Sequence, residues 1–560
     1  LKTMKKILNY IGILCVLVFA NTACSDSFLD ENVLDRYAPE SLNDKLGFDA
    51  AAIGLHRQFI SVYTNDQDQT LQGIWHVGTD ILWAPSGRSN GDARPYFSYS
   101  QMNSLDPASR KTWSALYRMI NNANILIYNA ENNNPAGMTD AEKDAFNAEA
   151  RFFRAHSYNM LATLYGDVPL LTEPLTAPKT DFVRTPINEV NAVIEQDLIF
   201  ATEFLPNAGS ASYESRINKM MAHQLLAEVY LRLNKPEDAE AQASAIINSG
   251  RYTLVNQRYG VNASGPGDPF SDMFILGNQR RNQGNTEGIW VAEMENPADV
   301  ANGGFGAPQQ RRIWVGGYYD IPGMEPADSL GGRGIARVRL NNWVLYGLYD
   351  DGDMRNSEYN IKRKLYFNNS GSAYNNIRGQ EVPYGVNSEF TLTNGNVIRI
   401  FPADTIWRMA PYSMKWGQFD SRDPFGYAMW KDFIVMRLGE TYLLRAEARL
   451  LKGDLAGAAA DINMLRQRAN APLVTAADIT LDFILDERAR ELLAEENRRM
   501  TLVRTGTLVE RARRLTGTTP LANGEIETTD GLQNFHMKMP IPQSEIDLNK
   551  DAELKQNEGY

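Results

Sequence analysis

The chain has 560 residues, of which 43% are hydrophobic and 22% are charged, and its formal net charge is −12. These proportions are ordinary for a folded protein in water. The acidic balance and the lack of any run of Lys and Arg argue against nucleic-acid binding and favour neutral ligands over polyanions. The only two cysteines, Cys15 and Cys24, lie near the N-terminus, which excludes a disulfide framework or a cysteine-based zinc site in the remainder of the chain.

The first 23 residues have the pattern of a secretory signal. Met4-Lys5-Lys6 is basic, residues 11–20 are apolar but too few to span a bilayer, and Ala23-Cys24 follows. A small residue before a cysteine is typical of lipoprotein processing, in which the acylated cysteine holds the mature chain on a membrane. We therefore predict a lipoprotein signal peptide over 1–23 and lipidation of Cys24. Because Asn21 replaces the aliphatic residue usual at its position, an ordinary cleaved signal or an uncleaved anchor is the alternative.

After a polar, acidic segment over 24–43, which we interpret as a tether, apolar residues recur at the spacing of amphipathic helices. Capping residues support several of these helices, as where Thr139-Asp140 precedes one of them. The pattern predicts a single, mainly α-helical domain over 44–560. The predicted helices cover 44–63, 112–131, 141–165, 187–204, 219–233, 236–249, 437–451, 455–469 and 479–503.

Two of the predicted helix pairs repeat each other. AEVYLRLNKPEDA at 227–239 aligns with AEARLLKGDLAGA at 446–458, so that the alanines and the central turn coincide. Small residues where helices cross, a short polar turn and a second alanine-rich helix are what hairpins of the tetratricopeptide type require. We predict several such hairpins as the scaffold. An ordinary helical bundle is the alternative.

Between the helical parts at 44–251 and 433–560 lies an irregular segment over 252–432. It has short strand-like runs, such as 288–294, separated by Gly, Asn and Pro, and it holds six of the nine tryptophans. Long loops commonly carry binding residues. We therefore predict that the middle segment faces the ligand or a partner and adds only a few short strands to the fold.

Motifs that carry catalytic chemistry are weak in this sequence. The five histidines are scattered, and the chain has no HExxH, P-loop or Gly-x-Ser-x-Gly motif. Glu293 and Glu295 could form a glycosidase pair on one face of a strand, but solvated acids at a strand edge are the alternative. Glu487, Glu491 and Glu495 recur beside several arginines, which favours ion pairs along a helix. We predict no enzymatic activity, no metal site and no cofactor.

Short motifs in a characteristic order run along almost the entire chain. They are CSDSFLD at 24–30, AEARFFRA at 148–155, LYGDVPL at 164–170, Asp353-x-Arg355, Lys415-Trp416, a hairpin from Arg437 to Arg466, a helix from Glu487 to Arg498, and QNEGY at 556–560, where Glu558 replaces the usual proline. In this order they resemble the SusD/RagB family of nutrient-binding outer-membrane lipoproteins of the Bacteroidetes type.

The resemblance implies tetratricopeptide-like hairpins, no catalytic residues, and a SusC-like TonB-dependent transporter as the partner, over whose barrel the protein acts as a lid. It also implies attachment to outer-membrane lipid through acylated Cys24, with the protein facing the exterior. We therefore predict a surface lipoprotein that binds a glycan or oligosaccharide and delivers it to the transporter. The same role with a peptide or another nutrient is the alternative, and a surface hydrolase is a further one.

Two loop-rich stretches combine flat aromatic rings with planar hydrogen-bonding groups, the composition that a sugar ring requires. In the second, Gly316-Gly317 frees the backbone beside three aromatic residues. Family members place ligand loops at similar chain positions, as the resemblance implies. Because most tryptophans in a protein of this size are core residues, burial is the alternative. The predicted ligand-binding residues are Trp83, Arg88, Asn90 and Tyr96 in the first stretch and Arg312, Trp314, Tyr318 and Tyr319 in the second.

Overall fold

The computed structural model describes residues 42–64, 75–83, 96, 98–210, 214–296, 298–299, 308–417, 420, 422–423, 429–516 and 530–560. The predicted signal peptide, the tether up to residue 41, Cys24, Arg88 and Asn90 lie outside the described residues. In the described part helices predominate and the strands are short, which confirms the mainly α-helical fold class. No helix there is long and apolar enough to cross a membrane.

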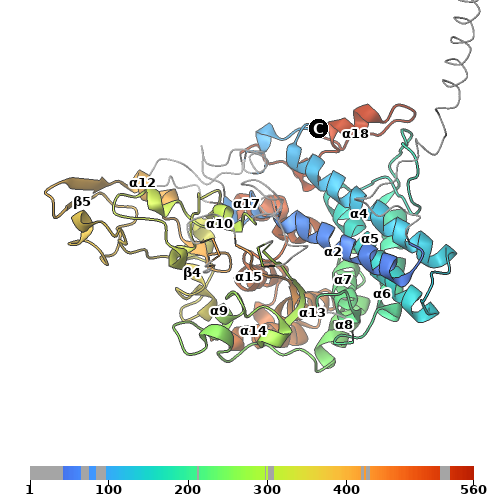
Figure 1. Ribbon diagram of the computed structural model, residues 1–560, viewed down its shortest axis with the longest axis horizontal. Coiled ribbons are helices and arrows are strands. Elements are labelled where there is room, and N and C mark those ends of the chain that lie inside the picture. Colours follow the sequence, from blue (N-terminus) through green and yellow to red (C-terminus); the bar gives the residue numbers. More distant parts are fainter. Residues whose placement is uncertain are drawn as a thin grey trace, which may run out of the picture.

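The long helices gather on one side of the molecule, and a lobe that carries β5 and α12 projects on the other (Figure 1). The N-terminal helices are α2 (Lys45–Thr64), α4 (Pro107–Asn132), α5 (Asp140–Tyr165), α6 (Ile187–Phe204), α7 (Lys219–Arg232) and α8 (Pro236–Asn248). The C-terminal helices are α13 (Leu438–Lys452), α14 (Leu455–Arg468), α15 (Leu481–Leu492), α16 (Arg498–Arg504), α17 (Leu508–Leu515) and α18 (Gln543–Leu548).

The middle of the chain forms only short elements. Its helices are α9 (Pro269–Asp272), α10 (Gln310–Trp314), α11 (Asn342–Tyr346) and α12 (Pro402–Arg408). The strands are β1 (Leu82–Trp83), β2 (Gly288–Ala292), β3 (Arg339–Leu340), β4 (Ile361–Lys362), β5 (Ser388–Thr391), β6 (Val397–Ile400), β7 (Tyr412–Ser413) and β8 (Phe433–Arg437). These strands pair as four two-stranded antiparallel sheets: β1 with β3, β2 with β8, β4 with β7, and β5 with β6.

Local capping signals explain where several helices begin. At the start of α5, the Thr139 hydroxyl accepts from the Glu142 N–H at 3.3 Å, and the Glu142 carboxylate accepts from the Thr139 N–H at 2.9 Å. This reciprocal capping box satisfies backbone donors that the first helical turn leaves without partners. Helix α4 begins five residues before the predicted start, because Asp106 caps it and Pro107 takes its first position.

The repeated sequence forms two helical hairpins, α7–α8 and α13–α14, and α8 packs against α13. The matching turn residues Asn234 and Gly453 both adopt left-handed backbone, with φ of 55° and 80°. The matching alanines Ala239 and Ala458, at the start of the second helix of each hairpin, are buried. Small side chains let the paired helices approach closely, so the two hairpins stack as tetratricopeptide-like units.

The prediction of one helix over 479–503 is wrong, because the chain breaks between α15 and α16. Ala494 adopts a left-handed φ of 65° at the break. The cause is not local: the Trp416 indole N–H donates to the Ala494 carbonyl at 2.9 Å, and Arg437 donates to the Glu491 carbonyl at 2.7 Å. Lys415 also donates to the Glu491 carbonyl, at 3.0 Å. Side chains from other segments therefore bind backbone carbonyls that would otherwise accept hydrogen bonds from the next helical turn.

A buried ion cluster lies beside this break. Glu487 pairs with Arg490 along α15, as predicted, at 2.9 Å, but most partners of the acids on α15 come from other elements. Glu491, for example, accepts from arginines on η9 (Met354–Asn356), β8 and α14. The residues of the cluster are Arg355, Arg437, Arg466, Arg468, Glu287, Glu487, Glu491 and Glu495. It thus ties the middle of the chain to the C-terminal hairpin.

Strand β2 joins the two helical parts. It is buried along its whole length and pairs with β8, with Gly288 opposite Arg437. The Trp290 ring stacks on Phe59 of α2, with the ring centroids 4.4 Å apart, and meets the rings of Phe152 and Phe153 edge-on. The strand ends at Ala292, before the acids at its predicted end.

Candidate ligand site

The two stretches that carry the predicted ligand residues lie on either side of the segment 335–341, which we call the bridging segment. On one side, Arg339 of β3 pairs with Trp83 of β1. On the other, the Ala336 N–H donates to the Val315 carbonyl, just after α10, at 2.9 Å. The structure therefore brings together two stretches that lie far apart in the sequence.

A side-chain contact also joins the second stretch to His76, which precedes the first stretch in the sequence. The imidazole of His76 meets the Trp314 ring edge-on, with the centroids 5.3 Å apart. Trp83 and Trp314 are each 3% exposed and His76 is 1% exposed. Burial lowers the pKa of His76 to about 3, so its imidazole is neutral at physiological pH. Both tryptophan rings belong to the main hydrophobic core, and their role as ligand contacts stays a prediction.

Three buried nitrogens at this junction have no hydrogen-bond partner among the described residues. They are the indole Nε1 atoms of Trp83 and Trp314 and Nδ1 of His76. A buried polar group without a partner costs about 1–3 kcal/mol. Such groups are uncommon in native structures and call for an explanation. The junction of the two stretches therefore concentrates buried nitrogens that no described part of the chain binds.

Two of the three tyrosines predicted as ligand contacts use their hydroxyl groups within the protein. Tyr96 donates to Asp106 at 2.6 Å, and its ring lies 4.7 Å from the Arg499 guanidinium. Tyr318 donates to the Gly332 carbonyl at 2.8 Å, and burial raises its pKa to about 12. Both side chains are fully buried. They hold the surrounding loops in place, and a direct contact with ligand stays a prediction for them.

Arg312 on α10 and Tyr319 just beyond it are the described candidates whose side chains reach the surface, since both are partly exposed. The Tyr319 ring stands against Tyr318, with the centroids 5.8 Å apart. The glycine at 316 is required by close packing, because a Cβ there would lie 2.2 Å from the Arg408 carbonyl oxygen. We call Arg312 and Tyr319, together with the buried Trp314, Trp83 and His76, the α10 surface.

Several residues that build this surface were not among the predicted ones. Arg311 pairs with Asp328 at 2.7 Å and fixes α10, and both side chains are buried. The Asn341 side chain donates to the Asp80 carbonyl at 3.0 Å and holds the bridging segment against the first stretch. His76 follows Trp75 shortly before Trp83, and this aromatic pair is the one sequence signal that points to it.

Glu293 and Glu295, the weak candidates for a catalytic pair, instead share an arginine. Arg280 pairs with Glu293 at 2.8 Å, with Glu295 at 3.0 Å and with Asp432 at 2.6 Å. Burial raises the pKa of Glu293, an effect that Arg280 opposes. The arrangement is an ion network next to the end of β2, and it assigns these acids a structural role.

The fold and this surface define a class of protein: a scaffold of helical hairpins whose irregular face carries aromatic and planar polar side chains. The model of the SusD family matches residues 270–560, and a second model, described as "Starch-binding associating with outer membrane", matches residues 87–231. The chain belongs to the SusD family.

Individual relatives agree with this membership. The chain is 24% identical to a SusD-like protein of Formosa agariphila over 95% of both chains. It is 26% identical to the starch-binding protein SusD of Bacteroides thetaiotaomicron, over 86% of this chain and 83% of that protein. Among solved structures, a laminarin-binding SusD-like protein superposes with a TM-score of 0.67 at 21% identity, covering 92% of this chain and all of the other. The surface glycan-binding protein A of Bacteroides fluxus gives 0.66 at 20% identity, covering 92% and 99%. Three of these four relatives are named for binding.

Proposed function

We propose that this protein is an outer-membrane surface lipoprotein that binds a glycan at the α10 surface. It hands the glycan, without transforming it, to a SusC-like TonB-dependent transporter. Family membership supports this role, as do relatives named for binding starch, laminarin and glycans. The observation that carries the choice of site is the convergence of two aromatic stretches on the bridging segment, which also holds α10 with its partly exposed Arg312.

The chemistry of the α10 surface suits a sugar. A sugar ring has an apolar C–H face that packs on aromatic rings and a rim of hydroxyl groups that bonds to planar polar groups. Tyr319 offers a partly exposed ring and Arg312 a planar guanidinium group, and Trp314 lies on the same short helix as Arg312.

Replacing Tyr319 with alanine should weaken the binding of oligosaccharide about tenfold, because truncation removes an exposed stacking ring. Tyr319→Phe, which keeps the ring, should bind within about threefold of the wild type, an energy difference of about 0.7 kcal/mol. Titration calorimetry with starch and laminarin oligosaccharides measures both. Tyr128→Ala is the matched control, since this tyrosine is 47% exposed on α4. Equal losses in Tyr319→Ala and Tyr128→Ala, or tight binding of peptides with no glycan bound, would overturn the proposal.

Replacing Cys24 with alanine should release the protein from the outer membrane, because it removes the thiol that is acylated. Metabolic labelling with a fatty acid, followed by fractionation, should show label in the wild type and none in the variant. The matched control is Cys15→Ala, which keeps Cys24 and should leave the label unchanged. Lipid label that persists in the Cys24→Ala variant, or wild-type protein that resists protease on intact cells, counts against a surface lipoprotein.

A transporter partner should purify with this protein, since a captured glycan must still cross the outer membrane. A lid held stably on a barrel buries more than about 2,000 Å² in total, so the complex should survive mild detergent. Purification through a C-terminal tag should retain an outer-membrane protein of much larger mass, and mass spectrometry identifies it. Recovery of the tagged protein alone, even after crosslinking, would reject the delivery role and leave a free surface binder.

A further inference from the structure

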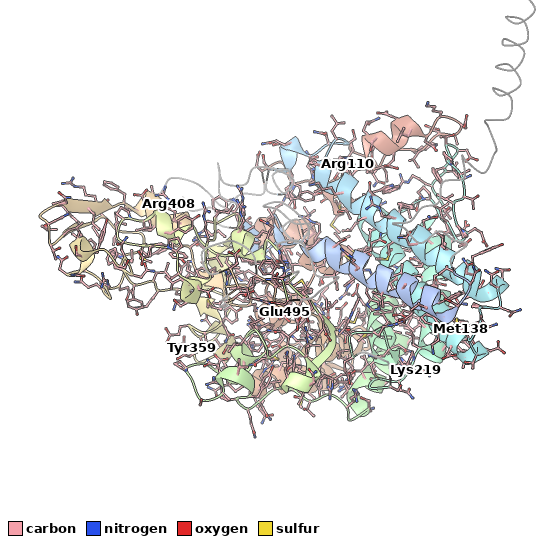
Figure 2. All side chains as sticks on the ribbon, in the orientation of Figure 1. Arg110, Met138, Lys219, Tyr359, Arg408 and Glu495 are labelled. Carbon is pink, nitrogen blue, oxygen red and sulfur yellow. The ribbon has the colours of Figure 1, made fainter. Side chains whose placement is uncertain are left out.

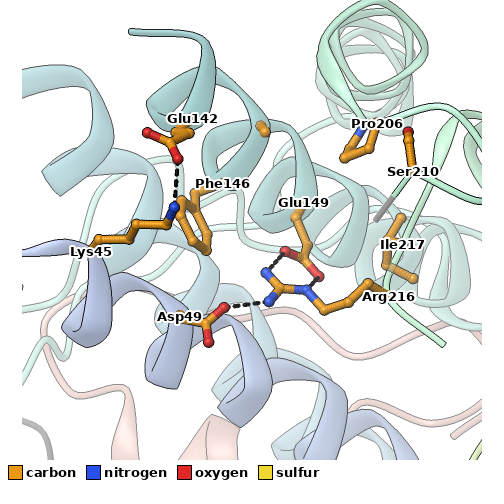
Figure 3. A pocket seen from close by; sticks show the side chains of 10 residues that line it. Lys45, Asp49, Glu142, Phe146, Glu149, Pro206, Ser210, Arg216 and Ile217 are labelled. Atoms are coloured by element: carbon orange, nitrogen blue, oxygen red, sulfur yellow. Dashed lines mark hydrogen bonds and ion pairs between the residues drawn. The ribbon is translucent and has the colours of Figure 1, made fainter. Parts of the chain in front are cut away.

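A cavity of about 180 Å³ opens on the helical side of the molecule, between α2, α5 and the segment that links α6 to α7 (Figure 3). Sites for drug-sized ligands measure about 300–1,000 Å³, so this cavity admits a single small ring and excludes a chain. None of its lining residues belongs to the α10 surface. In Figure 2, Met138 and Lys219, which lie close in sequence to the lining residues, are at the opposite end of the molecule from Arg408.

The charged side chains of the cavity hold one another in place. Arg216 forms a two-pronged pair with Glu149, at 3.0 and 2.5 Å, and reaches Asp49 at 2.5 Å. Lys45 pairs with Glu142 at 2.5 Å across the mouth of the cavity. Glu149 is buried and also bonds to His56 at 2.6 Å. These groups are fixed before any ligand arrives, which lowers the entropic cost of binding.

Both donors and acceptors remain available toward the cavity. Among the contacts of the described residues, Arg216 uses three of its five N–H groups and Lys45 uses one of three. One carboxylate oxygen of Asp49 accepts a bond and the other accepts none. Phe146, Pro206 and Ile217 add apolar surface between these polar groups. A hydroxyl group both donates and accepts, so a ring that carries several hydroxyl groups matches this lining.

The balance of charge selects against ionic ligands. Three carboxylates, on Asp49, Glu142 and Glu149, face two cations, on Lys45 and Arg216. An anion would meet the excess of negative charge, and a cation would be repelled by Lys45 and Arg216, which already pair with these carboxylates. We propose that this cavity is a second ligand site, which takes one neutral hydroxylated ring of hexose size. The site is independent of the glycan binding proposed for the α10 surface.

Saturation-transfer NMR on the full chain tests the site, with glucose and galactose as neutral probes, glucosamine as a cation and glucuronate as an anion. The wild type should bind a neutral hexose with millimolar affinity and should bind the charged sugars more weakly. Ala145→Trp fills the cavity from α5 without removing an ion pair and should weaken hexose binding about tenfold or more. The matched control is Ala141→Trp, an exposed position on the same helix that does not line the cavity, and it should bind as the wild type does.

Ser210→Trp provides a second way to fill the cavity, from the exposed loop after α6, should Ala145→Trp fold poorly by circular dichroism. Three results would overturn the proposal: no hexose binding to the wild type, preference for glucosamine or glucuronate, or hexose binding that survives the cavity-filling variants. If Tyr319→Ala loses hexose binding and Ala145→Trp keeps it, the hexose binds at the α10 surface and the second site is rejected. If Ala145→Trp loses hexose binding and Tyr319→Ala keeps it, the second site is supported, whether or not a glycan binds at the α10 surface.

Discussion

Replacing Glu491 with glutamine should lower the free energy of unfolding by about 3–5 kcal/mol, the range for breaking a buried ion pair. Its carboxylate accepts from Arg355 at 3.0 Å, from Arg437 at 2.5 Å and from Arg468. All four side chains are buried. Glutamine keeps the shape of the side chain but leaves three buried guanidinium groups with one negative charge fewer, and those groups cannot reach water.

Chemical denaturation measures this loss. The matched control is Glu389→Gln, which breaks the cross-strand pair with Arg399 on β5 and β6, at 2.8 Å. Both side chains of that pair are more than half exposed, so the control should change stability by about 0.5 kcal/mol or less. A loss below about 1 kcal/mol in Glu491→Gln would mean that the remaining acids compensate, and the ion cluster would not be the stabilising feature described here.

The same carboxylate makes stability depend on pH. Burial opposes ionisation of Glu491, but Arg468, Arg437 and Arg355 outweigh it and hold its pKa well below the usual value. A depressed pKa in the folded state means that the contribution is complete above the unfolded pKa of about 4.3 and is lost as the pH falls below it. The stability of the wild type should therefore decline more steeply on acidification below that pH than the stability of Glu491→Gln.

Replacing Asp80 with asparagine should cost about 3–5 kcal/mol of stability and should also weaken glycan binding. Asp80 is fully buried and accepts from Arg498 at 2.9 and 2.6 Å and from Arg511 at 2.8 Å. Burial alone would raise its pKa, but the two arginines hold that pKa below its usual value. Its backbone carbonyl also accepts from Asn341 of the bridging segment. Loss of the charge therefore loosens the part of the α10 surface that carries Trp83.

Asp482→Asn is the matched control, because Asp482 also bonds to Arg511 but is half exposed. It should lose about 1 kcal/mol or less and should bind glycan normally. Thermal melting and titration calorimetry on both variants separate the two effects. If Asp80→Asn is destabilised while its glycan affinity equals that of the wild type, the first stretch does not contribute to the α10 surface.

The helices could be predicted because their signals are local. The helix at 187–204 was placed at the observed bounds of α6, and the capping box at Thr139 marks the start of α5. The break at Ala494 could not be predicted, because Trp416, Arg437 and Lys415 cause it from other segments. Spacing along a chain carries no information about groups that approach from elsewhere in the fold.

The α10 surface could be predicted only in part, for a related reason. Loop-like composition around Trp83 and Trp314 predicted irregular backbone, but the structure places Trp83 in the short strand β1 and Trp314 at the end of the short helix α10. Composition does not distinguish a ring that faces solvent from one that packs inward, and both rings are buried. No sequence motif predicts the bridging segment, because its bonds to both stretches are made by backbone groups, which every residue type carries.

The bridging segment also bears on the order in which the chain folds. It joins β1 to residues near 340, and Asp80 reaches Arg498, so these contacts close very long loops of chain. Loop closure costs entropy before the contacts that it permits can form, whereas a helical hairpin such as α7–α8 closes between neighbours. The hairpins therefore form early and the α10 surface forms late. A newly made chain therefore acquires its helical scaffold before the residues of the α10 surface come together.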